Sequence, residues 1–185
     1  MIKFTKKAGV VVAIAAVLGT SAHAAVFNAS ASFRTIADVS ITEDTALNFG
    51  TAVTGKAGST CIITATAPDA APVIAVTALD AASTGCAATG QAAGQYVISG
   101  AASAVVTILV ATATDTDFSF APAGAFNSDQ AAGDVTTAFF ADSPINVTLD
   151  ASNTSILAVG GTLNIINGLT ASTSYAVPYD ISVVY

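Results

Sequence analysis

Few residues in this chain could carry acid–base or nucleophilic chemistry. His23 is the only histidine among 185 residues, and there is no tryptophan. A Ser-His-Asp or Cys-His unit needs an imidazole to move a proton, and zinc and copper sites usually draw on histidine or on several cysteines. Because His23 lies in an N-terminal stretch that we expect to be removed, we expect a protein that is not an enzyme and that holds no metal or cofactor.

One pair of carboxylates, Asp115 and Asp117, is closely spaced. Two carboxylates could serve a glycosidase, but such clefts commonly hold sugar rings on aromatic side chains, and tryptophan is absent. The same pair could contribute to a weak calcium site together with loop carbonyls. The alternative, a solvated turn, is the interpretation that we favour.

The chain has two cysteines, Cys61 and Cys86. In an exported protein, such a pair is expected to form a disulfide, which contributes roughly 3–4 kcal/mol for a loop of this size in the chain-entropy model. A reactive thiol pair is the alternative, but the spacing is not that of a Cys-x-x-Cys motif. We therefore expect a structural disulfide.

The first 24 residues have the pattern of a secretory signal peptide. Lys3 to Lys7 form a positive region, Ala8 to Leu18 an apolar core, and Ala22-His23-Ala24 a cleavage site between small residues. A retained membrane anchor is the alternative, but a spanning helix needs about 20 apolar residues. We expect residues 1–24 to be removed on export through the inner membrane, and the mature protein to be extracellular, secreted or on the cell surface, with no membrane insertion.

Residues 25–185 are strongly acidic. Arg34 and Lys56 are their only cations, against twelve carboxylates, so the net charge is −10. Binding to nucleic acid or to an anionic membrane needs clustered cations, so neither is an expected partner. Abundant Ala, Thr, Ser and Gly and few strong helix formers favour strands joined by turns.

Alternation of apolar and polar residues is the main structural signal. At the C-terminus, Tyr185 and five further apolar residues fall on one face, which predicts a strand over 175–185: Tyr175, Val177, Tyr179, Ile181 and Val183. Pro178 lies on the opposite face. Because proline cannot donate to a strand ladder, we expect this strand at the edge of a sheet.

Further strands are predicted along the chain. Those with alternation or β-forming composition are 60–66, 73–79, 95–99, 104–111, 118–120, 136–140, 145–149 and 163–166, the last after a tight turn at Gly160-Gly161. Eight or more short strands without helical periodicity predict an all-β fold, an antiparallel β-sandwich of the immunoglobulin-like or pilin-like kind with one disulfide. Residues 104–110 are apolar on both faces, which indicates a central strand covered by a loop or, alternatively, one that contacts another subunit.

A separate strand is predicted directly after the cleavage site. Phe27, Ala29, Ala31 and Phe33 alternate with polar residues, so residues 25–36 form a candidate N-terminal strand ahead of a domain over 37–185. A strand at a chain terminus can pair within its own domain, or it can complete the sheet of a neighbouring copy by β-augmentation. Both outcomes use the same residue pattern.

Short motifs give the domain a family resemblance. They are Val39-Ser40-Ile41, Leu47-Asn48-Phe49-Gly50, Gly100 after Tyr96–Ser99, Val159-Gly160-Gly161-Thr162-Leu163 and the terminal Val184-Tyr185. With these motifs the chain resembles a family of secreted bacterial β-sandwich domains of unknown function, similar in turn to pilin and spore-coat-U-type subunits. The pilin resemblance implies subunits that lack one strand, with the gap filled by the N-terminal strand of the next subunit.

By that resemblance, Phe27, Ala29, Ala31 and Phe33 are the inserted side chains. The residues bordering the acceptor groove are Tyr175, Val177, Tyr179, Ile181 and Val183. Pilins also join their first two strands by a disulfide, and Cys61 with Cys86 matches this only loosely in position. The leading hypothesis is a structural subunit of an extracellular bacterial filament or pilus, a homo-polymer of this chain. The alternative is a monomeric secreted adhesin or carbohydrate-binding sandwich, and the sequence names no host or matrix receptor for either.

Overall fold

The computed structural model is all-β and describes residues 32, 35–66, 75–77, 84–86, 90–128, 136–150 and 155–185. The predicted signal peptide and the side chains of Phe27, Ala29, Ala31 and Phe33 lie outside these residues. Ile36–Tyr185 form one compact unit. The described residues include no helix of the length and apolar character that crossing a membrane requires.

Thirteen strands are assigned in the described part of the chain, and every pairing between them is antiparallel. They are β1 (Ser40–Thr45), β2 (Asn48–Phe49), β3 (Thr60–Thr66), β4 (Ala75–Thr77), β5 (Gln91–Ala92), β6 (Gly94–Ser99), β7 (Val105–Val110), β8 (Ala113–Thr114), β9 (Phe118–Asn127), β10 (Thr136–Phe140), β11 (Ile145–Thr148), β12 (Ser155–Ile165) and β13 (Ile181–Val184). The predicted β-sandwich with one disulfide is confirmed. β1, β2, β5 and β8 are strands that the sequence pattern does not predict.

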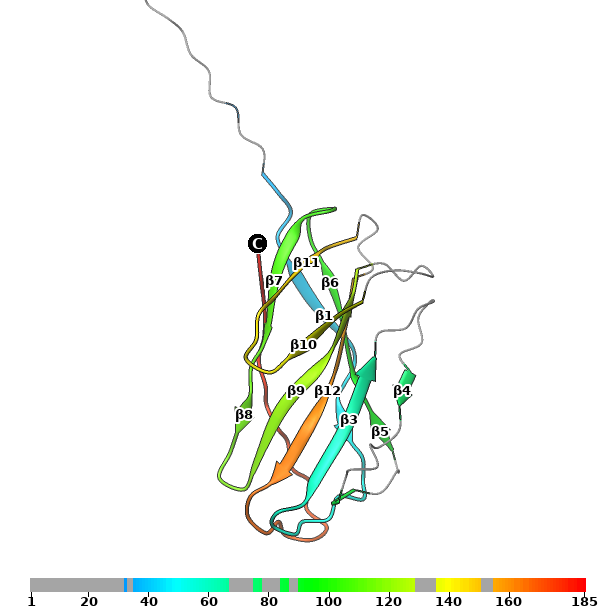
Figure 1. Cartoon of the computed structure of the whole chain (residues 1–185), viewed down its shortest axis with the longest axis vertical. Coiled ribbons are helices and arrows are strands. Elements are labelled where there is room, and N and C mark those ends of the chain that lie inside the picture. Colours follow the sequence, from blue (N-terminus) through cyan, green and yellow to red (C-terminus); the bar gives the residue numbers. More distant parts are fainter. Residues whose placement is uncertain are drawn as a thin grey trace, which may run out of the picture. The chain divides into compact units, whose positions relative to one another are not determined.

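Two sheets form the layers of the sandwich (Figure 1). In the larger sheet, β12 is bordered by β9 along one edge and by β6 and then β3 along the other, with β1 outside β6. The smaller sheet has the order β11-β7-β13, and a two-stranded sheet joins β2 to β5. Among the described residues, β1 pairs only with β6 and β13 pairs only with β7. Each is therefore an edge strand of its sheet.

The core lies between the sheets and is rich in phenylalanine. Phe120, Phe126 and Phe139 are almost fully buried, together with aliphatic side chains from β6, β7 and β12. Burying each such side chain contributes about 1.5–3 kcal/mol. On β7, Val106, Ile108 and Val110 face inward as alternation predicts, whereas Val105 is 60% exposed. β7 is therefore a central strand, but no described loop covers the outward face of Val105.

Gly160-Gly161 do not form the predicted turn, because β12 continues through both residues. At this point β12 changes its partner: Val159 is the last of its residues that pairs with β6, and Gly161 is the first that pairs with β3. The backbones approach closely here: a Cβ on Gly160 would lie 2.2 Å from the carbonyl oxygen of Ile63. The two glycines thus allow one long strand to pair with two others in succession. In the sequence alone, such a glycine pair cannot be distinguished from a turn, which is why the predicted turn is wrong here.

The predicted C-terminal strand is also shorter than expected. Only Ile181–Val184 pair with a neighbour, β7, and the preceding residues 173–180 are not in a strand. One further backbone hydrogen bond continues this pairing: the amide of Ala111, just after β7, donates to the carbonyl of Asp180. On the N-terminal side of Asp180 there is no β7 residue left to pair with, and Pro178 has no backbone N–H to donate. The residues there still alternate between apolar and polar, but they form no strand hydrogen bonds with β7.

The disulfide between Cys61 and Cys86 joins β3 to a residue that forms an isolated antiparallel bridge with Val53. The two Cα atoms are 5.6 Å apart, and Cys61 is fully buried. The bond thereby ties the loop after β2 to the larger sheet.

Gly160→Ala should strongly destabilise the protein. The added methyl group would overlap the Ile63 carbonyl, and the strand cannot move without disturbing three neighbours, so we expect a loss above about 3 kcal/mol in the free energy of unfolding. Gly168→Ala is the matched control, since its Cβ would meet only the Gly55 carbonyl oxygen at 3.8 Å. Urea unfolding of both variants checks this, and equal stabilities would contradict the close approach.

Candidate functional site

The inward face of β1 is left uncovered. Ile41 pairs in register with Ile98, and Glu43 with Tyr96, both of which are buried on the core side of β6. Ile41 and Glu43 therefore point toward the layer occupied by the smaller sheet, yet Ile41 is 37% exposed and Glu43 is exposed. The cause is the width of the smaller sheet: it ends at β13, and no further described strand lies beyond it.

A groove of about 360 Å³ lies along this margin. One wall comes from β1 and the other from the segment leading into β13, with a tyrosine of β6 between them; the lining residues are Ile41, Glu43, Tyr96, Val177, Pro178, Tyr179 and Ile181. The margin is thus a channel lined by aliphatic side chains, two tyrosines and one glutamate. It lies between the margins of two different sheets, where one more strand could lie.

The floor of this groove is a pair of tyrosines. The hydroxyl oxygens of Tyr96 and Tyr179 are 2.6 Å apart, which joins β6 to the segment before β13 by a hydrogen bond. Tyr179 also packs edge-on against Phe120, with ring centroids 5.2 Å apart. These two rings separate the groove from the core and limit its depth at this level.

Burial raises the pKa of both Tyr96 and Tyr179 above the ordinary tyrosine value. Their mutual hydrogen bond lowers the pKa of Tyr96 and raises that of Tyr179, and the nearby Glu43 carboxylate raises both further. The two hydroxyls therefore stay neutral at physiological pH. Among the described residues, Glu43 is the only charged one that lines the groove.

Tyr185 holds one end of the groove. Its hydroxyl accepts a hydrogen bond of 2.7 Å from the Ala101 amide and donates to the carbonyl of Ala37, just before β1. Gly100 makes room for it, since a Cβ there would lie 2.8 Å from the Tyr185 hydroxyl oxygen. The C-terminal residue is thus attached to the segment that enters β1, which fixes the two walls relative to each other.

The walls run antiparallel from this fixed end. Ala37 lies beside Tyr185, and farther along Glu43 lies at the level of Tyr179, because each of them is next to Tyr96. Stepping by two along each wall places Val39 opposite Val183 and Ile41 opposite Ile181. After Glu43 the register of β1 shifts, and Thr45 pairs with Gln95 on the other face of β6. The groove therefore offers about three successive positions for inward-pointing side chains of an added strand.

The structure brings together three of the residues predicted to border a groove: Val177, Tyr179 and Ile181 line it. Val183 packs against the core nearby. Tyr175 lies apart: its ring packs edge-on against Phe118, and its hydroxyl accepts a hydrogen bond from the Thr170 amide.

Sequence reasoning misses the other wall and Tyr96, one of the two tyrosines of the floor. Ile41 and Glu43 belong to β1, of which the sequence marks only a family motif and not a strand. Alternation of Val39, Ile41 and Glu43 is an available signal, but the charge of Glu43 breaks the apolar pattern. Tyr96 falls on a predicted strand without any sign that it reaches Tyr179.

Asp115 and Asp117 lie in the turn that joins β8 to β9. The carboxylate of Asp115 accepts a hydrogen bond from the amide of Thr116, and the carbonyl of Asp117 accepts from the amides of Ile166 and Asn167. Within the described ranges, no three potential metal-binding side chains gather in one place. The arrangement is that of a hydrogen-bonded turn.

Comparison with family models, with curated proteins and with solved structures found no match to this chain. The family resemblance drawn from short motifs therefore stays a prediction. The groove and the strands around it are the basis on which a function can be inferred.

The tyrosine pair should make the protein sensitive to alkali. The folded chain keeps Tyr96 and Tyr179 protonated, whereas the unfolded chain ionises them near the ordinary pKa of 10.0, so their contribution is fully present below about pH 10 and is lost as the pH rises above it. Urea unfolding between pH 8 and pH 11 should show this decline, and Tyr179→Phe should reduce its slope. Tyr175→Phe, a tyrosine outside the groove, should keep it; the same slope in both variants would contradict the assignment.

Proposed function

We propose that this protein is a structural subunit of an extracellular filament, and that it polymerises when the N-terminal strand of one copy enters the groove of the next. The observation that carries the proposal is the uncovered inward face of β1 opposite the unpaired edge of β13. A sandwich normally covers both inner faces of its sheets. A single added strand would cover Ile41 and would pair with the free edge of β13.

The open margin also needs a partner for a physical reason. Unpaired strand edges promote uncontrolled association unless they are protected, and here two edges flank one groove. Pairing with an extended segment satisfies the backbone groups of an edge while pockets receive alternate side chains. A strand supplied by another copy would remove the hazard and would link the copies.

The segment 25–35 has the properties that this groove requires. Four alternate side chains, Phe27, Ala29, Ala31 and Phe33, can line up along the groove. Three of them take the positions between the two walls, one at an end lies past Tyr179 beside Val177, and the two small ones fall in the middle. The middle positions are those of Ile41 with Ile181 and of the tyrosine pair, where the floor is shallow.

The path of the chain favours exchange between copies. Residues 36–39 contain no turn or bend, and none of them has a positive φ, so the chain enters β1 without reversing direction there. The contact of Tyr185 with Ala37 holds this stretch in place. Self-insertion would instead need a hairpin between the strand and β1.

Ile41→Arg should prevent filament formation, because a guanidinium group in the apolar groove would oppose the inserted strand. Thr42→Arg is the matched control: Thr42 pairs with Val97 on the other face of the same strand. Both positions are exposed, so both variants should fold. Electron microscopy of the purified proteins should show fibres with a regular repeat for wild type and for Thr42→Arg, and monomers for Ile41→Arg.

Compact wild-type monomers under the same conditions would reject the proposal and would favour the alternative, a monomeric secreted binding module. If Ile41→Arg forms fibres as well as wild type does, the contact between subunits does not involve the groove beside Ile41.

The inserted strand makes a second prediction. Ala31→Phe should raise the protein concentration needed for assembly at least about fivefold, because overfilling a packed site costs about 1–3 kcal/mol and the tyrosine pair limits the depth of the groove. Ser32→Phe adds a ring on the opposite face of the strand and should leave assembly near wild type. Sedimentation over a concentration series distinguishes them, and equal behaviour would exclude this face of the strand from the groove.

A further inference from the structure

We infer that Glu43 makes filament assembly depend on pH, because a strand that enters the groove covers its carboxylate with apolar side chains. This inference rests on the proposed function and concerns the regulation of the same groove. Subunits in which Glu43 is ionised resist assembly, and subunits in which it is protonated accept the strand. Acid therefore promotes assembly.

Glu43 belongs to the wall of the groove that β1 provides. It pairs in register with Tyr96 of β6, and it lines the groove together with Tyr96 and Tyr179. In the single copy its side chain is exposed. The carboxylate is therefore solvated until a strand covers it.

The side chains that face Glu43 carry no compensating charge. Tyr96 faces it from β6 and Tyr179 from the segment before β13, and no other titratable side chain of the described residues lines the groove. The carboxylates adjacent in sequence, Asp44 and Asp180, are not part of the lining. No described cation is thus in place to keep Glu43 ionised once water leaves the groove.

The tyrosines supply hydrogen bonds that suit either form of Glu43. Burial raises the pKa of Tyr96, and a hydrogen bond with the Glu43 side chain adds to this effect. An ionised carboxylate can only accept hydrogen bonds, so Tyr96 donates to Glu43, and Tyr179 donates to Tyr96. A protonated carboxyl group keeps an acceptor oxygen. Glu43 can therefore lose its charge without breaking this chain of hydrogen bonds.

The inserted strand also brings no partner for the charge. From Phe27 to Phe33 its apolar face contains only phenylalanine and alanine, and the two alanines fall at the level of Ile41 and of the tyrosine pair. An alanine methyl group therefore lies beside Glu43 whichever way the strand runs. Arg34, the one charged residue of segment 25–35, alternates to the other face.

The direction of the pH effect follows from covering a charge. Taking a carboxylate out of water without a cationic partner favours its protonated form. Assembly then takes up a proton, so it is favoured at low pH and is opposed as the pH rises through the range in which glutamates titrate, roughly pH 4–6. A shift of one pH unit in this proton binding changes the concentration needed for assembly about tenfold.

The test is the pH dependence of assembly in the full-length chain. Wild type should assemble at a protein concentration at least about tenfold lower at about pH 4.5 than at about pH 7.5. Glu43→Gln imitates the protonated form, because its side chain is neutral and keeps an acceptor oxygen. This variant should assemble more readily than wild type at the higher pH, and its response to pH should be about tenfold smaller. Sedimentation over a concentration series measures both.

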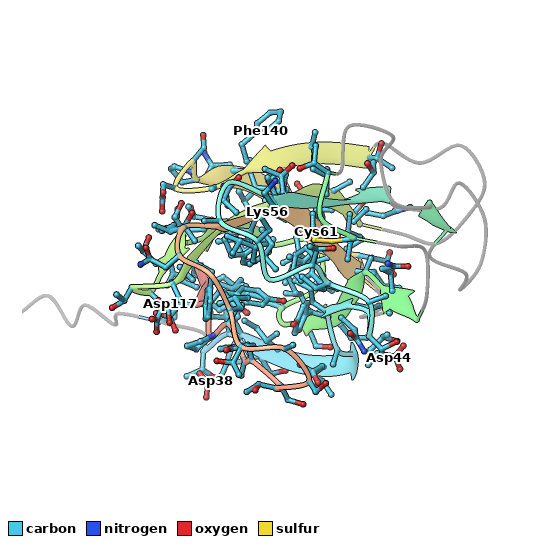
Figure 2. The ribbon with its side chains drawn as sticks, turned by 90° about the horizontal axis from the view of Figure 1, so that it is seen from below. Asp38, Asp44, Lys56, Cys61, Asp117 and Phe140 are labelled. Atoms are coloured by element: carbon cyan, nitrogen blue, oxygen red, sulfur yellow. A yellow bond between two sulfur atoms is a disulfide. The ribbon has the colours of Figure 1, made fainter. Side chains whose placement is uncertain are left out.

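Asp44→Asn is the matched control, because acid also weakens the general repulsion between acidic subunits. It removes the same charge from the adjacent residue, which is exposed and which Figure 2 shows pointing outward beside β1. Asp44→Asn should keep the wild-type response to pH. Proton uptake during assembly in weakly buffered solution is the second readout, and it should be larger for wild type and for Asp44→Asn than for Glu43→Gln.

The outcomes distinguish the two proposals. If wild type assembles and Ile41→Arg does not, but Glu43→Gln and Asp44→Asn respond alike to pH, the role of Glu43 is wrong while groove insertion stands. Weaker assembly of Glu43→Gln than of wild type near neutral pH also overturns it, since the charge would then be an attractive contact. If wild type stays monomeric at both pH values, both proposals are wrong.

Urea unfolding of each variant at both pH values shows whether altered assembly is altered folding. If Glu43→Gln does not fold, the proton uptake of wild type decides alone: assembly without uptake contradicts the inference.

Discussion

The two sheets of this sandwich differ in width, and the candidate site follows from that difference. The larger sheet extends through β6 to β1, while the smaller sheet ends at β13. The inward side chains of β1 therefore have no layer opposite them, and Ile41 stays partly in water although its neighbour in register, Ile98, is fully buried. The groove lies where the smaller sheet ends, among the residues that the structure describes.

The larger sheet can be wide because β12 holds neighbours along both edges. β9 borders it for ten residues, while β6 and β3 share the other edge in succession. The change of partner requires backbones to approach more closely than side chains allow, which is why glycines occupy the point of change. β6 can then lie apart from β3 and pair with β1, which forms the edge of the larger sheet.

Aromatic side chains keep the incomplete margin stable. Tyr179 packs edge-on against Phe120 and is hydrogen-bonded to Tyr96, so the floor of the groove is fixed to the core behind it. Tyr185 closes one end through the Ala37 carbonyl. A gap bounded in this way is preorganised, and a preorganised site loses less conformational entropy when a partner enters it.

The sequence alone determined the all-β class, the disulfide and many of the strands, because each depends on local composition or on alternation between neighbouring residues. It also indicated the face of the C-terminal segment that packs inward, since Val177, Tyr179 and Ile181 keep a period of two even where hydrogen bonding stops. Only the tertiary structure decided that Gly160-Gly161 lie inside a strand, and that Glu43 and Tyr96 meet Tyr179 across a groove. Those facts depend on which strands become neighbours across long stretches of chain, and pairing of that kind leaves no mark in the periodicity of any single segment.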